Sequence, residues 1–190
     1  MKPGKLIIIS APSGSGKSTI INEIMKDESL GLEFSISATT RPIRRGEQDG
    51  VNYYYYNEDQ FKAAIARDEF AEYQEVYPGR YYGTLKREIE RINDNGKNVI
   101  LDLDVLGGVN VKKMYGNRAI SIFIMPPSIE TLRHRLLSRG TDSIEDIEKR
   151  VEKADFEIQQ ARHFDHQVIN DVLRTAIDQV HALVKHFVEE

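Results

Sequence analysis

Short apolar runs recur along the chain, and residues with helical spacing separate them. Continuous, β-branched runs at residues 6–9, 98–104 and 119–124 are typical of strands buried in a parallel sheet. Residues 32–37 alternate apolar and polar side chains, as a strand with one buried face does, and residues 167–170 predict a last short strand. The pattern therefore predicts several strands, with helices between them, over most of the chain.

Helices are predicted where apolar residues recur at intervals of three and four positions. They span residues 18–25, 58–67, 85–95, 129–138, 144–161 and 173–187. Asn57 with Gln60 has the pattern of a capping box, and Gly96 suits the position just after a helix. The pair Gly107–Gly108 is interpreted as a break in the chain. The apolar stripe expected to pack inward from the long helix is Ile144, Ile147, Val151, Ala154, Ile158 and Ala161.

The composition mainly excludes several classes of function. The chain has 190 residues, no cysteine and a formal net charge of −4, from 26 basic and 30 acidic residues. This acidic balance argues against a general nucleic-acid-binding surface, and no apolar run is long enough for a signal peptide or a membrane span. We expect a single cytoplasmic domain with no nucleic-acid or membrane partner, no disulfide and no thiolate metal site.

The loop after the first strand carries the strongest candidate chemistry. It reads Ala11-Pro12-Ser13-Gly14-Ser15-Gly16-Lys17-Ser18 and joins a buried strand to a helix, as a phosphate-binding P-loop does. Its glycines let successive N–H groups turn toward a phosphate, Lys17 can neutralise phosphate charge, and the Ser18 hydroxyl can reach Mg²⁺. Ala11 departs from the strict pattern, which begins with glycine. The alternative is a flexible turn with a solvated lysine, and the order and context of these residues disfavour it.

An arginine-rich loop and a run of tyrosines follow the second predicted strand. Residues 38–53 hold Arg41, Arg44 and Arg45 among proline and glycine residues, which favours a constrained loop. Guanidinium groups there suit bidentate capture of phosphate, although a solvated surface cluster is the alternative. Tyrosines in residues 53–56 alternate between two faces of a strand, so one pair is expected to pack and the other to face a cleft.

Further candidate ligands lie at the ends of strands and helices. Aromatic residues and isolated acids in 69–73 and 81–84 suit recognition of a flat base, or else belong to the core. Asp102 follows a buried run, where a P-loop enzyme holds a carboxylate near Mg²⁺; a turn or N-cap role is the alternative. Arg135 and Arg139 share a helix face, and a bound anion would offset their repulsion, although a solvated face is also possible.

Together these segments resemble the guanylate kinase family over essentially the whole chain. The P-loop is similar to that family's version, in which the first glycine is often replaced. The most specific match is the family's signature segment, formed here by Thr39, Thr40, Arg41, Arg44, Glu47, Gly50, Tyr53 and Tyr55. The likeness continues through 81–84, 100–104, Arg135-x-x-x-Arg139-Gly140-Thr141 and 168–171. Departures from the family pattern are Tyr56, Leu106 and a longer turn at 76–80.

The resemblance implies an α/β fold in three parts. These are a P-loop NTPase-type parallel sheet core with helices on both faces, an inserted small α+β GMP-binding subdomain, and a helical lid. The core would comprise residues 1–36, 97–126 and 166–190, the GMP-binding subdomain 37–96, and the lid 127–165. The implied reaction is Mg²⁺-dependent transfer of the γ-phosphoryl group of ATP to GMP, and also to dGMP, giving ADP and GDP. A monomer or a weak homo-oligomer is expected.

The resemblance also implies roles for individual residues. The GMP phosphate would be held by Ser37, Arg41, Arg44, Tyr53 and Tyr82, and the guanine edge would be read by Glu72, Thr84 and Asp104. Carboxylates there would accept from the N1–H and N2–H groups of guanine. The implied ATP ligands are Ala11, Pro12, Ser13, Gly14, Ser15, Gly16, Lys17, Ser18, Thr19, Arg135, Arg139 and Asn170. Mg²⁺ would be held by Ser18 and, through water, by Asp102. The implied catalytic residues are Lys17, Arg41, Arg135, Arg139 and Arg150.

Two other functions remain as alternatives. Guanylate-kinase-like domains of scaffold proteins bind phosphorylated peptides at the GMP site, but they usually have degraded ATP loops, whereas Lys17 and Ser18 are intact here. A kinase of the same fold could instead act on another acceptor, such as a ribose phosphate. In that case Glu72, Thr84 and Asp104 would have no guanine to read.

Overall fold

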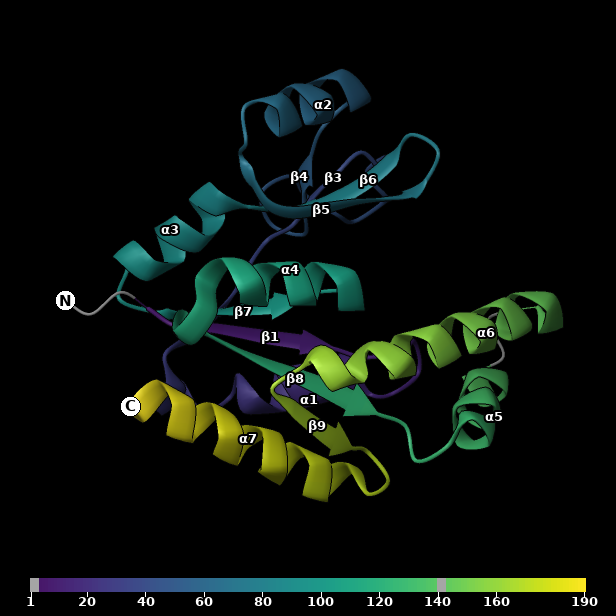
Figure 1. The fold of residues 1–190 in the computed structure, drawn as a ribbon. Coiled ribbons are helices and arrows are strands. Elements are labelled where there is room, and N and C mark those ends of the chain that lie inside the picture. Colours follow the sequence, from purple (N-terminus) through teal and green to yellow (C-terminus); the bar gives the residue numbers. More distant parts are fainter. Residues whose placement is uncertain (1–3, 140–142) are drawn as a thin grey trace.

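The computed structural model describes residues 4–139 and 143–190. Its centre is a five-stranded sheet with every neighbouring pair parallel, in the order β2 (Leu32–Phe34), β7 (Asn98–Asp102), β1 (Leu6–Ser10), β8 (Ala119–Met125) and β9 (His166–Ile169). Figure 1 shows this sheet across the middle of the molecule. The predicted continuous apolar runs are its inner strands, which neighbours flank on both sides.

Helices cover both faces of this central sheet. Alternate residues of β1 pack on one face with α3 (Lys86–Asp94) and α4 (Val105–Tyr115). The other β1 residues pack with α1 (Lys17–Ile24) and α7 (Leu173–Glu189) on the opposite face (Figure 1). The absence of alternation in β1 follows from this position, because both of its faces are buried. The predicted α/β class, with a parallel sheet and helices on both faces, is confirmed.

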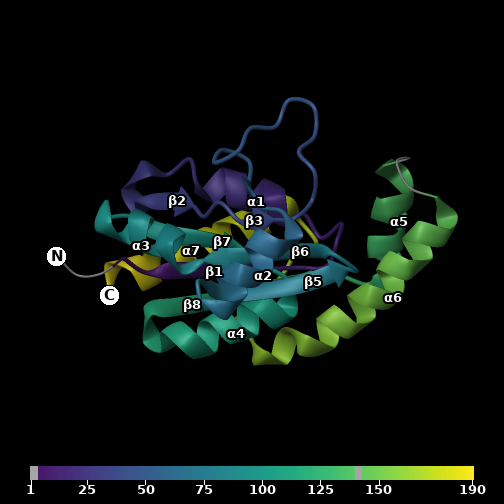
Figure 2. The same cartoon turned by 90° about the horizontal axis from the view of Figure 1, so that it is seen from above.

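A smaller sheet lies beside the first. Its strands are ordered β4 (Tyr54–Tyr55), β3 (Ala38–Thr39), β6 (Arg80–Leu85) and β5 (Phe70–Tyr77), and α2 (Glu58–Ala66) packs on it (Figure 2). The predicted capping box begins α2: the Gln60 amide donates to Asn57 Oδ1, and the Asn57 amide donates to Gln60 Oε1, both at 2.8 Å. The buried residues of this part are Ala38, Phe61, Ala64, Phe70 and Leu85.

Two helices, α5 (Ile129–Arg139) and α6 (Ile144–Gln160), form a third part of the molecule (Figure 2). Their own small core is Leu132, Leu136, Ile147 and Ala154. The short 3₁₀ helices are η1 (Glu28–Leu30), η2 (Gly116–Arg118) and η3 (Ala161–His163). Among the described residues, no helix has both the length and the apolar character that a membrane crossing requires.

The interpretation of Gly107–Gly108 as a chain break is wrong, because both glycines lie inside α4. The preceding strand ends at Asp102, and Asp104 is the N-cap of α4, accepting from the Gly107 amide at 2.7 Å. Close packing explains the glycines: a Cβ on Gly107 would lie 2.8 Å from Glu72 Oε2, and one on Gly108 would lie 2.9 Å from Ser10 Oγ. Glycine lowers helix propensity by about 1 kcal/mol, and packing outweighs that cost here.

Three boundaries also differ from the predictions. The strand predicted at 32–37 ends at Phe34, because the chain leaves the central sheet and joins the smaller one at β3. Only Tyr54–Tyr55 of the tyrosine run forms a strand, which matches the short length of its partner β3. Ile144 was expected to pack, but it is 72% exposed, because the packed stripe of α6 begins at Ile147.

Candidate active site

The loop between β1 and α1 has the backbone that a P-loop requires. Gly14 and Gly16 have φ angles of 95° and 86°, in the left-handed region that residues with a side chain rarely adopt. Gly16 is the N-cap of α1, so the unpaired amides of the first helical turn point toward the loop's opening. A helix N-terminus of this kind attracts phosphate oxygens through its N–H groups and its dipole.

Asn170, at the end of β9, supports this loop from below. Its Nδ2 donates to the carbonyl of Ser15 at 2.8 Å, and its side chain is 4% exposed. A Cβ on Gly16 would lie only 2.4 Å from that nitrogen, so only glycine at position 16 leaves room for the Asn170 side chain. Arg135 Nη2 in turn donates to the Asn170 carbonyl at 2.9 Å, which connects α5 to the loop. Asn170 and Arg135 also line a cavity of about 260 Å³, together with Thr19.

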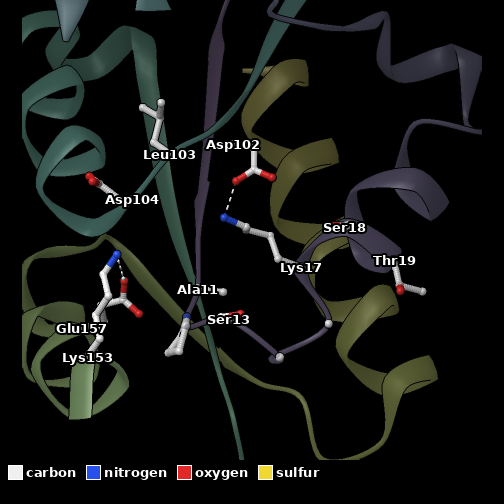
Figure 3. A pocket seen from close by; sticks show the side chains of 13 residues that line it. Ala11, Ser13, Lys17, Ser18, Thr19, Asp102, Leu103, Asp104, Lys153 and Glu157 are labelled. Atoms are coloured by element: carbon white, nitrogen blue, oxygen red, sulfur yellow. Dashed lines mark ion pairs between the residues drawn. The ribbon is translucent and has the colours of Figure 1, made fainter. Parts of the chain in front are cut away.

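A cavity of about 400 Å³ opens above the loop (Figure 3). It is lined by Ala11, Pro12, Ser13, Gly14, Gly16, Lys17, Ser18, Thr19, Asp102, Leu103, Asp104, Lys153 and Glu157. Lys17 forms an ion pair with the Asp102 carboxylate across this cavity, as Figure 3 shows. The structure therefore brings the predicted phosphate-binding lysine, the Ser18 hydroxyl and the Asp102 carboxylate to one cavity.

A second cavity, of about 320 Å³, lies between the central sheet and the smaller sheet. It is lined by Phe34, Ser37, Asn52, Tyr53, Glu72, Gln74, Val76, Tyr82, Gly83, Asp102, Leu103, Asp104 and Lys153. The residues that it shares with the first cavity are Asp102, Leu103, Asp104 and Lys153. The two cavities therefore have a common wall, formed by the end of β7, the start of α4 and one residue of α6.

A buried carboxylate lies at one end of this second cavity. Glu72 of β5 is opposite Thr84 of β6 in the sheet register, and the Thr84 hydroxyl donates to Glu72 Oε1 at 2.8 Å. Burial raises the pKa of Glu72 to about 7, and the negative charge of Asp104 adds to this effect. A carboxyl group in this state is suited to a ligand that supplies N–H donors, since each donor stabilises the ionised form.

Arg41 is held by a carboxylate and by the rings of two tyrosines. Its Nη1 and Nη2 donate to the two Glu47 oxygens at 3.0 and 2.8 Å, and the Tyr55 hydroxyl donates to Glu47 Oε2 at 2.7 Å. The guanidinium also lies over the rings of Tyr53 and Tyr55, at 5.3 and 5.8 Å from their centroids. The Arg41 guanidinium and neighbouring donors lower the pKa of Glu47 to about 2.

The structure does not place either predicted arginine of this loop in the lining of the second cavity. Arg41 and Arg44 line a neighbouring cavity of about 660 Å³, and Tyr82 is common to both cavities. Tyr82 and Tyr53 lie edge to face, with ring centroids 6.0 Å apart. The two arginines therefore line a cavity that shares Val76 and Tyr82 with the second cavity.

The predicted arginines of α5 and α6 have different surroundings. Arg150 Nη1 donates to Ser13 Oγ in the P-loop at 3.1 Å, so α6 reaches the first cavity. Arg135 is linked to the loop through Asn170, as described above, and lines a cavity with Gly14 and Gly16. The side chain of Arg139 and residues Gly140 and Thr141, also parts of the predicted motif, lie outside the described part of the structure.

The sequence reasoning missed two charged residues that line the first cavity, Lys153 and Glu157. Both belong to α6. Lys153 lies three residues after Arg150 and Glu157 lies four residues after Lys153, so all three lie on one helix face. That spacing is a signal present in the sequence, next to the apolar stripe of the same helix. Burial raises the pKa of Glu157, and nearby Lys153 and Lys17 partly offset this.

Comparisons with known proteins identify the family of this chain. A family model described as "Guanylate kinase" matches residues 3–187. A guanylate kinase from Porphyromonas gingivalis is 53% identical over 97% of this chain and 98% of its own length, and one from Bacteroides thetaiotaomicron is 52% identical over 98% and 91%. A crystal structure of guanylate kinase from Anaplasma phagocytophilum superposes with a TM-score of 0.76 at 27% identity, covering 100% of this chain and 89% of that one. The chain belongs to the guanylate kinase family.

Proposed function

We propose that this protein transfers the γ-phosphoryl group of ATP to GMP, giving ADP and GDP. The observation that carries the proposal is the common wall of the two cavities at Asp102–Asp104, with a P-loop on one side and a buried carboxyl group on the other. Two phosphorylated substrates bound in these cavities would meet at that wall. Family membership and relatives named guanylate kinase support the same reaction.

The donor nucleotide would bind in the first cavity. Glycine-enabled backbone amides and the start of α1 would hold its phosphates, and Lys17 would exchange Asp102 for a phosphate partner. Arg150, already in contact with Ser13, is placed to add a further positive charge. Asn170 and Arg135 would keep the loop in its binding shape. Arg139 is proposed as a ligand of ATP on the family resemblance alone.

The acceptor would bind in the second cavity with guanine against Glu72 and Asp104. The ionised Glu72 would accept from the N1–H and N2–H groups of guanine, while Thr84 holds the carboxylate in place. Ser37, Tyr53 and Tyr82 would hold the phosphate of GMP, and Arg41 and Arg44 would approach it from the neighbouring cavity. We find no described residue whose role requires the 2′-hydroxyl, which supports dGMP as a further acceptor.

Mg²⁺ fits the residues of the first cavity. Mg²⁺ bound to nucleotide phosphates keeps several waters and takes only one or two protein oxygens. The Ser18 hydroxyl and, through water, the Asp102 carboxylate supply such oxygens in the cavity that holds the P-loop. When bound, Mg²⁺ would neutralise charge that develops on the phosphate oxygens.

The three parts of the fold suit three roles in this proposal. The central-sheet part, residues 1–36, 97–126 and 166–190, would hold the donor site, and residues 37–96 would form the GMP-binding subdomain. Residues 127–165 would act as the helical lid that excludes water from ATP. A cysteine-free chain and nucleotide substrates support a cytoplasmic location, and we expect a monomer or a weak homo-oligomer.

The test is ADP release in a coupled assay with ATP and Mg²⁺, comparing GMP, dGMP, AMP, UMP and ribose phosphates as acceptors. We expect rapid turnover with GMP and dGMP and little with the others. Turnover only with another acceptor would contradict the role of Glu72 and Asp104. No turnover from folded protein, together with phosphopeptide binding, would replace the kinase with a binding module.

A further inference from the structure

One basic residue of α6 lies where the two substrate cavities meet. Of the described residues that line both cavities, three belong to the segment Asp102–Asp104 and the fourth is Lys153. Lys17 lines the first cavity but not the second. Lys153 is therefore the single cation, among these described lining residues, that faces both the donor and the acceptor cavity.

The surroundings of Lys153 are otherwise acidic. Asp102 and Asp104 belong to the common wall, and Glu157 lines the first cavity next to them. Phosphate groups that meet at this wall would be repelled by three carboxylates unless cations are present. Lys17 is paired with Asp102, on the far side of the first cavity from α6 (Figure 3). A second cation on the α6 side would complete the neutralisation.

Lys153 is weakly held in the structure. Its Nζ lies 3.6 Å from Glu157 Oε1, one helical turn further along α6, and its side chain is 61% exposed. Glu157, in contrast, is a buried residue with 7% exposure. Because the lysine side chain is mostly exposed and the contact is long, the pair holds the ammonium group weakly, and a phosphate can replace the carboxylate as the partner of the lysine. Figure 3 shows both side chains extending from α6 on the side of the cavity where Asp104 lies.

We propose that Lys153 leaves Glu157 and binds the phosphoryl groups of both substrates at the junction of the two cavities. This inference rests on the proposed function, because it takes the two nucleotides as the ligands. Lys153 would then be a further residue that contacts substrate during phosphoryl transfer. Glu157 would hold the Lys153 ammonium group at the junction when no phosphate is bound.

The alternative is an ordinary helix-surface pair with no contact to substrate. The chain offers a matched example one turn earlier on α6, where Lys149 Nζ lies 3.2 Å from Glu145 Oε1. Lys149 has a similar exposure, 66%, and lines neither of the two cavities. Comparing the same substitution at both lysines separates a substrate contact from a general effect of removing charge from α6.

The experiment compares Lys153→Met, Lys153→Arg and Lys149→Met with the wild type. We expect Lys153→Met to lower kcat/KM for GMP and for ATP by about tenfold or more, since it removes a charge-assisted contact to phosphate. Lys153→Arg should recover much of that loss, and Lys149→Met should remain within about twofold of the wild type. Equal values for Lys153→Met and Lys149→Met would overturn the proposal.

A binding measurement separates this inference from the proposed function. Calorimetric titration with inorganic tripolyphosphate needs no turnover, and Lys153→Met should weaken its Kd about tenfold. Glu157→Gln should tighten the same Kd by about two- to fivefold, because it removes a competing partner and a nearby negative charge. If the wild type fails to phosphorylate GMP but the two variants show these shifts in Kd, the proposed function is refuted and the Lys153 contact is retained. Unchanged Kd values for both variants would refute the contact.

Discussion

Lys17, in the first turn of α1, forms an ion pair with Asp102 at the end of β7. The pair lies in the cavity above the P-loop, and both side chains are partly exposed to it. In the proposed reaction the lysine turns from this carboxylate to the phosphates of ATP, and the carboxylate becomes available to water around Mg²⁺. The pair thus holds both groups in place before the nucleotide binds.

Lys17→Ala should abolish most turnover and leave the fold intact. Loss of one preorganised positive group at a developing charge lowers kcat by about 10²–10³-fold. The melting temperature should change little, because partly exposed ion pairs contribute about 1 kcal/mol or less. ADP release and thermal unfolding measure the two effects. Lys26→Ala, which breaks the exposed pair with Glu23, is the control with normal turnover. Turnover of Lys17→Ala within about threefold of the wild type would refute the mechanism.

GMP binding should weaken as the pH falls through neutrality. The pKa of Glu72 is raised to about 7 in the absence of ligand, so the group binds a proton below that pH and no longer accepts from guanine N–H groups. KM for GMP should therefore rise between about pH 8 and pH 6. In Glu72→Gln it should be higher and nearly independent of pH over that range. A wild-type KM that stays flat would mean that the carboxyl group does not read the guanine.

The same shift predicts an effect on stability. A raised pKa in the folded state means that ionising Glu72 opposes folding. This cost is absent below the ordinary pKa of about 4.5, grows as the pH rises, and is complete above about pH 7. Between these limits the wild type should lose about 3 kcal/mol of unfolding free energy relative to Glu72→Gln. Urea unfolding of both proteins at about pH 4.5 and pH 8 measures the difference. A constant difference across this range would contradict the raised pKa.

Glu47→Gln should lower kcat/KM for GMP by about tenfold, because Glu47 acts on the substrate indirectly, by holding Arg41. The neutral amide cannot form the two-oxygen ionic contact that holds Arg41, so the guanidinium loses its fixed position beside Tyr53. Because the pKa of Glu47 is about 2, the wild-type contact should persist throughout the working pH range. Glu58→Gln, which loses an exposed pair with Lys62 on α2, serves as the control. Equal kinetics of the two variants would show that Arg41 needs no such support.

Gly108→Ala should destabilise the protein although alanine favours helices. Its Cβ would lie 2.9 Å from Ser10 Oγ and 3.1 Å from Phe164 Cζ. Such overpacking costs about 1–3 kcal/mol, which exceeds the gain in helix propensity of about 1 kcal/mol. We expect a melting temperature lower by a few degrees. Asn110→Ala, on the exposed side of the same helix, should be neutral or slightly stabilising. A more stable Gly108→Ala variant would contradict the packing argument.

Much of the fold was predictable because its signals are local. The apolar run at 6–9, the loop that follows it and the capping box of Asn57 with Gln60 depend on neighbours within about four positions. These features appear in the structure as β1, the P-loop and the start of α2. The order of loop, signature segment and strands was also sufficient for the family to be named.

The remaining features depend on contacts between residues far apart in the sequence. Gly107 and Gly108 indicate a break by their own propensity, yet they are helical because β1 and β5 approach too closely for a Cβ. Lys153 and Glu157 look like an ordinary surface pair until the fold places α6 against the end of β7. By itself the sequence determined the elements, the phosphate loop and the family, since short-range spacing encodes them. Only the tertiary structure decided which charges share a cavity, because that depends on packing across the whole chain.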